Sequence, residues 1–246
     1  MEVLLAGHLD DPEDGFGLQQ AVLEEVGDGR RRPAALAWSS GRYVAATRLE
    51  TRNAGFGRAV SLAAEFGFPT FVRNSGGGAV AANAGSLSFS LTFPVEDLRR
   101  GLYERYADLS ALIVAALKRL GVAAEPGEVE GAFCPGTYSV RVGGPRGIKV
   151  AGLAQRVTRR AARAEALVLV NETAGLVPVL RSFYEALGLP FRDGSVEDLP
   201  VSVADVTRAL AEEVEARYGA APGEVGTGTM QRARALRGTW RPPALF

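Results

Sequence analysis

The 246-residue chain carries 28 lysine and arginine residues and 28 aspartate and glutamate residues, which gives it a formal net charge of zero. This balance argues against the basic surfaces of nucleic-acid-binding proteins and the polybasic anchors of membrane-associated proteins. Hydrophobic residues make up 47% of the chain, enough for a large buried core, and no apolar stretch is long enough to span a bilayer. We therefore expect a globular protein that binds neither nucleic acid nor membrane.

The cysteine and histidine content bears on compartment and on metal binding. A single cysteine, Cys134, allows no intrachain disulfide and is typical of a reducing cytoplasm. Residues 1–8 lack the basic n-region of a secretory signal peptide, so we expect a cytoplasmic protein. With one cysteine and one histidine in the chain, we expect no structural zinc site and predict no metal.

Hydrophobic periodicity predicts helices and strands that follow each other along the chain. Apolar residues spaced three to four apart predict helices over 12–26, 57–65, 102–120, 176–187 and 202–218. Alternating or continuous apolar runs predict strands over 34–38, 43–47, 70–72, 86–94, 138–142, 148–153 and 166–170. Gly121 ends the third helix, and Ser202 and Asp205 form a capping box at the last. Residues 123–135 are expected to form a loop, and residues 143–147 the turn of a β-hairpin.

Together these elements predict an α+β fold with a mixed β-sheet covered by helices. No internal repeat or low-complexity linker divides the chain, so we expect residues 1–219 to form one domain. Residues 220–246 are rich in glycine, proline and arginine, and we expect them to form a loosely ordered tail.

Three consecutive glycines, Gly76 to Gly78, precede one of the predicted strands, within the sequence RNSGGGAV of residues 73–80. Glycine accepts positive φ and lets a ligand approach the backbone. In the strand, Leu87 and Phe89 alternate with serines, which predicts that one face is buried. A glycine run without the spacing of a P-loop is a weak motif. The turn is therefore interpreted either as a place where a ligand lies along the sheet or as a flexible hairpin turn.

Cys134 and Lys149 are the candidates for covalent chemistry. A lone cysteine is most often a small buried hydrophobe. Cys134, however, lies in the turn-forming sequence FCPG, where a side chain is more accessible than in a core strand. Lys149 is one of two lysines in the chain and lies in an apolar strand, which favours an ammonium with a function over a snorkelling side chain. His8 is the only histidine, and we expect a surface or structural role for it.

Several arginines could bind anions or could simply be solvated. Arg73 precedes the glycine turn and could meet a carboxylate or phosphate. A second group could dock an acidic protein surface, and it comprises Arg156, Arg159, Arg160 and Arg163.

Three blocks of sequence are more specific together than any one of them alone. They are RNSGGGAV followed by AGSLSFSL at 73–80 and 84–91, GAFCPGTYS at 131–139, and GIKVAGLAQR at 147–156. In order and spacing they resemble the signature of the lipoate and biotin protein ligase superfamily, and the resemblance extends from about residue 16 to residue 199.

The block around Cys134 is most similar to that of the octanoyl amidotransferases of this superfamily. The resemblance implies that Cys134 is an acyl-thioester nucleophile and that Lys149 is its catalytic partner. It also implies that the glycine turn and the strand after Lys149 form the acyl site, with a tunnel lined partly by Leu87, Phe89 or their neighbours. The substrate-binding residues are then Arg73, Ser75, Gly76, Gly77, Gly78, Ala79, Val80, Tyr138, Val150, Ala151 and Gly152.

The resemblance also implies partners. The donor would be octanoylated or lipoylated H protein or acyl carrier protein, the acceptor a lipoyl domain of a 2-oxoacid dehydrogenase, and no cofactor would be needed. One alternative is an ATP-dependent lipoate–protein ligase that uses ATP and magnesium to form an acyl-adenylate. Another is a non-catalytic member that only binds an acyl chain or a lipoyl domain.

Overall fold

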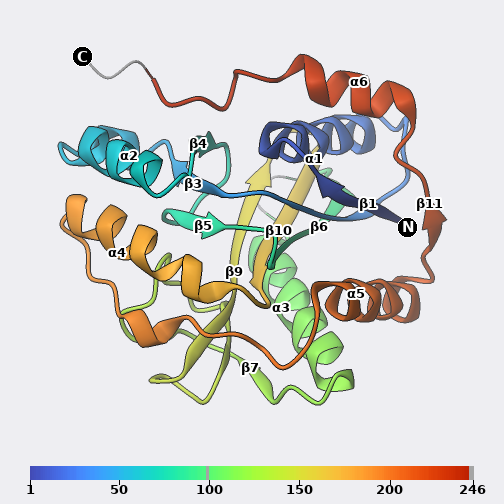
Figure 1. Ribbon diagram of the computed structural model, residues 1–246. Coiled ribbons are helices and arrows are strands. Elements are labelled where there is room, and N and C mark those ends of the chain that lie inside the picture. Colours follow the sequence, from blue (N-terminus) through green and yellow to red (C-terminus); the bar gives the residue numbers. More distant parts are fainter. Residues whose placement is uncertain (98–99, 244–246) are drawn as a thin grey trace.

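Two β-sheets organise the protein in a computed structural model that describes residues 1–97 and 100–243 (Figure 1). The large sheet contains, in spatial order, β11 (Ala221–Gly223), β1 (Glu2–Leu9), β2 (Ala34–Ser40), β6 (Ser86–Pro94), β10 (Ala161–Leu169), β9 (Ile148–Val157), β8 (Val140–Val142) and β7 (Ala124–Pro126). The small sheet contains β4 (Thr70–Arg73), β3 (Tyr43–Thr47) and β5 (Val80–Ala82). Both sheets mix parallel and antiparallel pairs, which confirms the predicted fold class.

The helices cover both faces of the large sheet and the outside of the small one. They are α1 (Pro12–Gly27), α2 (Phe56–Glu65), α3 (Leu102–Arg119), α4 (Val177–Ala186), α5 (Val203–Tyr218) and α6 (Thr227–Ala235). The expected caps are confirmed, because Gly121 has a φ of +77° and the Ser202 hydroxyl accepts from the Asp205 N–H at 3.1 Å. No helix in the described part of the chain combines the length and apolar character needed to cross a membrane.

Strand β6 is buried on both faces, which corrects the expectation of a half-buried strand. Leu87 and Phe89 pack with α3 and α5 in one core cluster. The serine face is also buried: Ser88 pairs with Trp38 on β2, and Trp38 belongs to the cluster on the α1 side. Alternation therefore distinguished the two faces correctly, but small serine side chains allow the polar face to be covered as well.

The loop expected over 123–135 is interrupted by a short strand, β7, which pairs with β8. The predicted hairpin is confirmed, since Val142 pairs with Ile148 across the turn at 143–147. This hairpin and the loop before it bring Lys149 and Cys134 to the same place.

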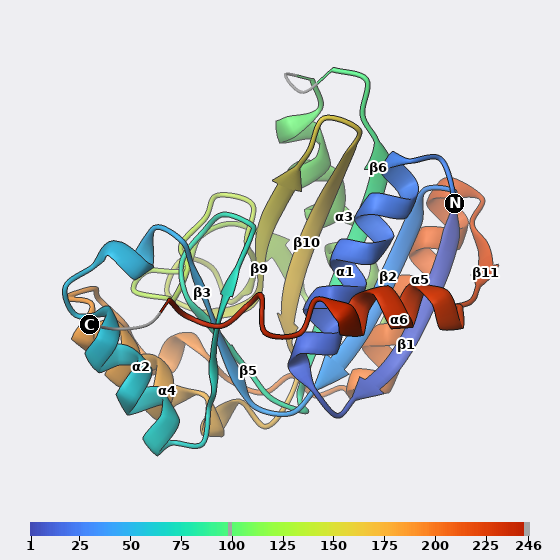
Figure 2. The same cartoon turned by 90° about the horizontal axis from the view of Figure 1, so that it is seen from above.

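The C-terminal segment is folded, which corrects the expectation of a loosely ordered tail. β11 pairs with β1, and α6 packs along α1 (Figure 2). Beyond α6 the chain continues toward the small sheet, where the Val72 N–H donates to the Trp240 carbonyl at 2.6 Å. The Trp240 side chain is buried in the core cluster beside α1. Residues 244–246 of the expected tail lie outside the described residues.

Candidate active site

Cys134 lies in the loop between β7 and β8 and is only 4% exposed. Burial is what a small hydrophobe would show, yet Cys134 also lines a cavity between α1 and the two sheets. Its backbone has a φ of +42°, a left-handed conformation that is uncommon for a non-glycine residue. The surrounding structure must therefore hold this residue in place.

Lys149 is buried against the same loop and is 1% exposed, which excludes a snorkelling side chain. Its ammonium donates to the Phe133 carbonyl at 2.8 Å and to the Cys134 carbonyl, and it lies 4.8 Å from the centre of the Phe133 ring. Burial lowers the pKa of Lys149 from 10.5 to about 8, although negative charge on Cys134 opposes the shift. Lys149 thus contacts the backbone of the cysteine residue and can exchange a proton near neutral pH.

The glycine turn closes over the sulfur of Cys134. The Gly78 N–H donates to Sγ at 3.1 Å, and Arg73 Nη2 lies 3.9 Å from Sγ. A β-carbon on Gly77 would lie 2.8 Å from Sγ, closer than any ordinary contact. The absence of a side chain at Gly77 therefore allows the close approach, and two donors are directed at the sulfur.

Arg73 is held by a buried network of charges. Glu165 on β10 accepts from the Arg163 Nε at 2.6 Å and from the Ser75 hydroxyl, and it lies 3.6 Å from Arg73 Nη1. Burial alone would raise the pKa of Glu165, but Arg163, Arg73 and Ser75 outweigh it and hold the pKa below 4.5. Arg73 also donates to the Gly78 carbonyl at 2.8 Å. The network therefore fixes a permanent positive charge next to the turn.

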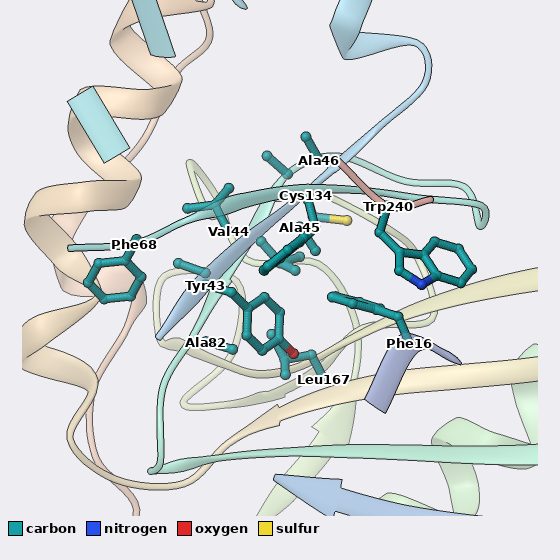
Figure 3. Close-up of a cluster of buried hydrophobic side chains, with 14 of the residues drawn as sticks. Phe16, Tyr43, Val44, Ala45, Ala46, Phe68, Ala82, Cys134, Leu167 and Trp240 are labelled. Atoms are coloured by element: carbon teal, nitrogen blue, oxygen red, sulfur yellow. The ribbon is translucent and has the colours of Figure 1, made fainter. Parts of the chain in front are cut away.

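The cavity that Cys134 lines is mostly apolar, and Figure 3 shows the sulfur pointing toward the side where Phe16 and Trp240 lie. Phe16 packs edge-on against Trp38 and Tyr43, with ring centres 5.8 and 5.3 Å apart. Of the predicted site residues, those that line the cavity with Cys134 are Arg73, Val80 and Gly152. Its other lining side chains include Phe16, Trp38, Tyr43, Leu153, Ala154, Ala166 and Leu167.

Other residues predicted to bind substrate lie elsewhere. Leu87 and Phe89 belong to the core cluster with α3 and α5 and do not line the cavity, whereas their neighbour Ser88 does. Val150 and Ala151 belong to the same core cluster on the far face. Tyr138 stacks on Tyr106 of α3 with ring centres 5.3 Å apart, and Gly76 is exposed to solvent. Ser75 and Ala79 anchor the turn, because the Ser75 hydroxyl donates to Glu165 and the Ala79 N–H donates to Glu50 at 2.7 Å.

Of the other residues singled out in the sequence, His8 and the arginine-rich stretch, only Arg163 belongs to the buried network beside the site. His8 is exposed on β1 and its Nδ1 lies 3.3 Å from the Ser39 hydroxyl. Arg163 belongs to the buried network, whereas Arg160 is exposed and pairs with Asp28 at 2.8 Å. The arginine-rich stretch is therefore not one docking surface.

Sequence reasoning missed two residues around Cys134. Tyr184 on α4 accepts from the Cys134 N–H at 2.6 Å and donates to the Ala79 carbonyl at 2.8 Å. No pattern in the sequence marks this tyrosine. Glu165, in contrast, is an acid inside the apolar strand β10, which is the same signal that drew attention to Lys149 in β9.

The fold and this site define a class of protein: an α+β domain in which a buried cysteine, with a lysine beside it, lies at an apolar cavity. The chain belongs to the lipoyl protein ligase A/B catalytic domain family, whose model matches residues 11–217.

Relatives and solved structures agree with this assignment. The chain is 32% identical over 180 residues to an octanoyl-[GcvH]:protein N-octanoyltransferase of Geobacillus kaustophilus, covering 73% of this chain and 62% of the relative. It is 33% identical over 181 residues to the protein of the same name from Anoxybacillus flavithermus, covering 71% and 62%. The chain thus spans about three fifths of the length of these relatives.

The fold is similar to that in a crystal structure of lipoate-protein ligase A bound with ATP. The TM-score is 0.76 at 18% identity, covering 96% of this chain and 93% of the other. At this level of identity the likeness establishes the fold.

Proposed function

We propose that this protein is an acyltransferase that moves an octanoyl or lipoyl group, through a thioester on Cys134, to a lysine of a lipoyl domain in protein lipoylation. The observation that carries the proposal is the contact of the Gly78 N–H with the Cys134 sulfur at 3.1 Å, beside an apolar cavity. The names of the two relatives support the same chemistry. Cys134 and Lys149 are the proposed catalytic residues.

In the first step, the Cys134 sulfur attacks the carbonyl carbon of the acyl donor. The new carbon–sulfur bond replaces the bond to the donor amine or thiol, which leaves with the proton that the thiol loses. Lys149 can carry this proton, because its lowered pKa of about 8 lies near neutrality. In the second step, a lysine amine of the acceptor attacks the thioester, and the proton it loses returns to the sulfur.

Charge that develops during these steps lies near fixed donors. The Gly78 N–H and the Arg73 guanidinium are directed at the sulfur. Donors that are already in place stabilise developing negative charge without reorganising during the reaction. The Cys134 N–H is occupied by Tyr184, so the Gly78 amide is the backbone donor available here.

The acyl chain would extend from Cys134 into the cavity lined by Phe16, Trp38, Tyr43 and Leu167, which are apolar or aromatic; the cavity has a volume of about 40 Å³, so these side chains must move apart to admit an octanoyl chain. Burial of each methylene of the chain would contribute about 0.8 kcal/mol. Gly152 leaves room in the wall of this cavity, close to the Lys149 side chain. We propose no cofactor for the transfer reaction and a cytoplasmic location.

The names of the relatives specify octanoylated GcvH, so we propose octanoylated H protein as the donor, with acyl carrier protein as the alternative. The rival function is an ATP-dependent lipoate–protein ligase, in which Lys149 and the glycine turn would hold an acyl-adenylate. That rival gives no role to a cysteine held against the turn.

Intact mass spectrometry separates these possibilities. The protein is incubated separately with octanoylated H protein, with octanoylated acyl carrier protein, and with octanoate plus ATP. A gain of one octanoyl group from a carrier, without ATP, supports the transferase and identifies its donor. Release of pyrophosphate with octanoate and ATP, and no gain from either carrier, supports the ligase. A protein that binds carriers but gains no acyl group under any condition is a non-catalytic member.

A further inference from the structure

Both backbone groups of Cys134 are held by side chains from distant parts of the chain. The N–H donates to the hydroxyl of Tyr184 at 2.6 Å, and the carbonyl accepts from the ammonium of Lys149. This matters because the residue has a φ of +42°, which a cysteine does not adopt without support. Lys149 was singled out by the sequence, whereas Tyr184 has no assigned role.

The same Tyr184 hydroxyl also holds the glycine turn. It donates to the Ala79 carbonyl at 2.8 Å, and a carboxylate oxygen of Glu50 accepts from the Ala79 N–H at 2.7 Å. Ala79 follows Gly78, whose own N–H contacts the sulfur. One hydroxyl therefore bridges the residue that carries the nucleophile and the turn that carries its amide donor.

Close packing leaves little freedom in this arrangement. Tyr184 is 2% exposed, and a β-carbon on Gly78 would lie 3.2 Å from the hydroxyl oxygen and 3.4 Å from the Cys134 α-carbon. Without the hydroxyl, the Cys134 N–H and the Ala79 carbonyl would both lose their partner in a buried place. The loop and the turn could then separate.

We propose that Tyr184 is a positioning residue that sets the Cys134 sulfur against the Gly78 amide. This inference rests on the proposed function, because it assumes that Cys134 is the nucleophile. Tyr184 does not exchange a proton in this role. Burial raises the pKa of its hydroxyl, so the hydroxyl stays neutral throughout the working pH range.

The test is the single-turnover rate at which Cys134 gains an octanoyl group in wild type and in Tyr184→Phe, followed by mass. Cys134 is the only cysteine, so alkylation with iodoacetamide reports the same thiol independently. Tyr218→Phe is the matched control, because it removes the hydroxyl of a partly buried tyrosine at the end of α5 that donates to Asp108 of α3, outside the candidate site. All proteins are compared well below their unfolding temperatures.

We expect Tyr184→Phe to acquire the acyl group about 10- to 100-fold more slowly, since misplacing reacting atoms by about 1 Å costs on the order of 10²-fold. The donor KM should change much less than kcat, because the loss lies in the placement of the sulfur and not in binding of the donor. A rise in KM that accounts for the whole loss, with kcat unchanged, would overturn the positioning role.

The two proposals fail differently. If wild type gains the acyl group and Tyr184→Phe gains it at the same rate, the positioning role is wrong while the transferase stands. If wild type gains no acyl group on Cys134 from any donor, the transferase itself is wrong. Should Tyr184→Phe not fold, hydrogen exchange in wild type still decides: the Cys134 amide should be protected, and exchange as fast as that of a free loop amide would contradict the bond to Tyr184.

Discussion

Replacing Gly77 by alanine should disable the nucleophile while leaving the protein folded. The new methyl group would lie 2.8 Å from the Cys134 sulfur and 3.0 Å from Arg73 Nη2. Ordinary non-bonded contacts lie at about 3.5–4.0 Å, so the sulfur or the turn must move by roughly 0.7 Å. Gly77 also has a φ of +96°, and forcing an alanine into such a conformation costs about 1–2 kcal/mol.

A displacement of this size separates the sulfur from the Gly78 amide, so we expect thioester formation to slow by on the order of 10²-fold. The assay is the single-turnover gain of an octanoyl group, with urea unfolding to measure stability. Gly76→Ala is the matched control, because a β-carbon there meets nothing within 4 Å and the backbone is not left-handed. For it we expect a change within about 0.5 kcal/mol, or roughly twofold in rate. Equal rates for Gly77→Ala and Gly76→Ala would refute the argument that the turn closes over the sulfur.

Three further substitutions test the surroundings of the site. Lys149→Met should slow thioester formation, whereas Lys118→Met, which replaces the other, exposed lysine, should not. The pKa of Lys149 is about 8 in the folded protein and 10.5 in the unfolded chain, so the unfolded chain binds more protons between those pH values. The free energy of unfolding of wild type should therefore rise across that window by about 3 kcal/mol relative to Lys149→Met. Denaturant titrations from pH 7 to 10.5 in which the two proteins change stability in parallel would contradict this. Glu165→Gln should cost about 3–5 kcal/mol and slow transfer, because it leaves Arg73 and Arg163 buried without a counter-charge, whereas Glu130→Gln, in an exposed pair with Arg146, should cost less than about 1 kcal/mol. Trp240→Ala should cost about 3 kcal/mol in urea unfolding, and no loss would mean that the C-terminal segment does not pack on the core as described.

Much of the secondary structure could be predicted because it depends on local signals. The helix that begins after Ser202 has its cap, its acid at the third position and its terminal glycine in the sequence, and all three act as expected in α5. The hairpin around residues 143–147 was marked by glycines between two apolar runs, and it forms as predicted.

Tertiary contacts decided the features that were not predicted. β1 and β11 are strands because β1 pairs with β11 on one side and with β2 on the other, and neither β1 nor β11 has a clear alternation of its own. The segment after Gly219 looks polar and flexible, but α6 and Trp240 find partners on α1 and β4 that only the folded chain provides. The same is true of the serine face of β6, whose burial depends on what covers it.

The residues of the candidate site also fall into those that local sequence marks and those that only tertiary contacts reveal. Cys134, Lys149 and the glycine turn carry unusual residue types in unusual surroundings, so sequence reasoning could find them. Tyr184 looks like any tyrosine of an amphipathic helix, and its role depends on two backbone atoms about 50 and 105 positions away. No local pattern records such a contact.

The central claim is that the acyl group passes through Cys134 on its way to the acceptor, and a chase experiment tests it most directly. The protein is loaded with octanoylated H protein, separated from the donor, and digested in part to locate the added mass. The remainder is mixed with a lipoyl domain without ATP. We predict that the octanoyl group is on Cys134, that it moves to the lipoyl-domain lysine at least as fast as steady-state turnover, and that Cys134→Ala neither loads nor transfers. Acceptor modification at full rate by Cys134→Ala would contradict the account.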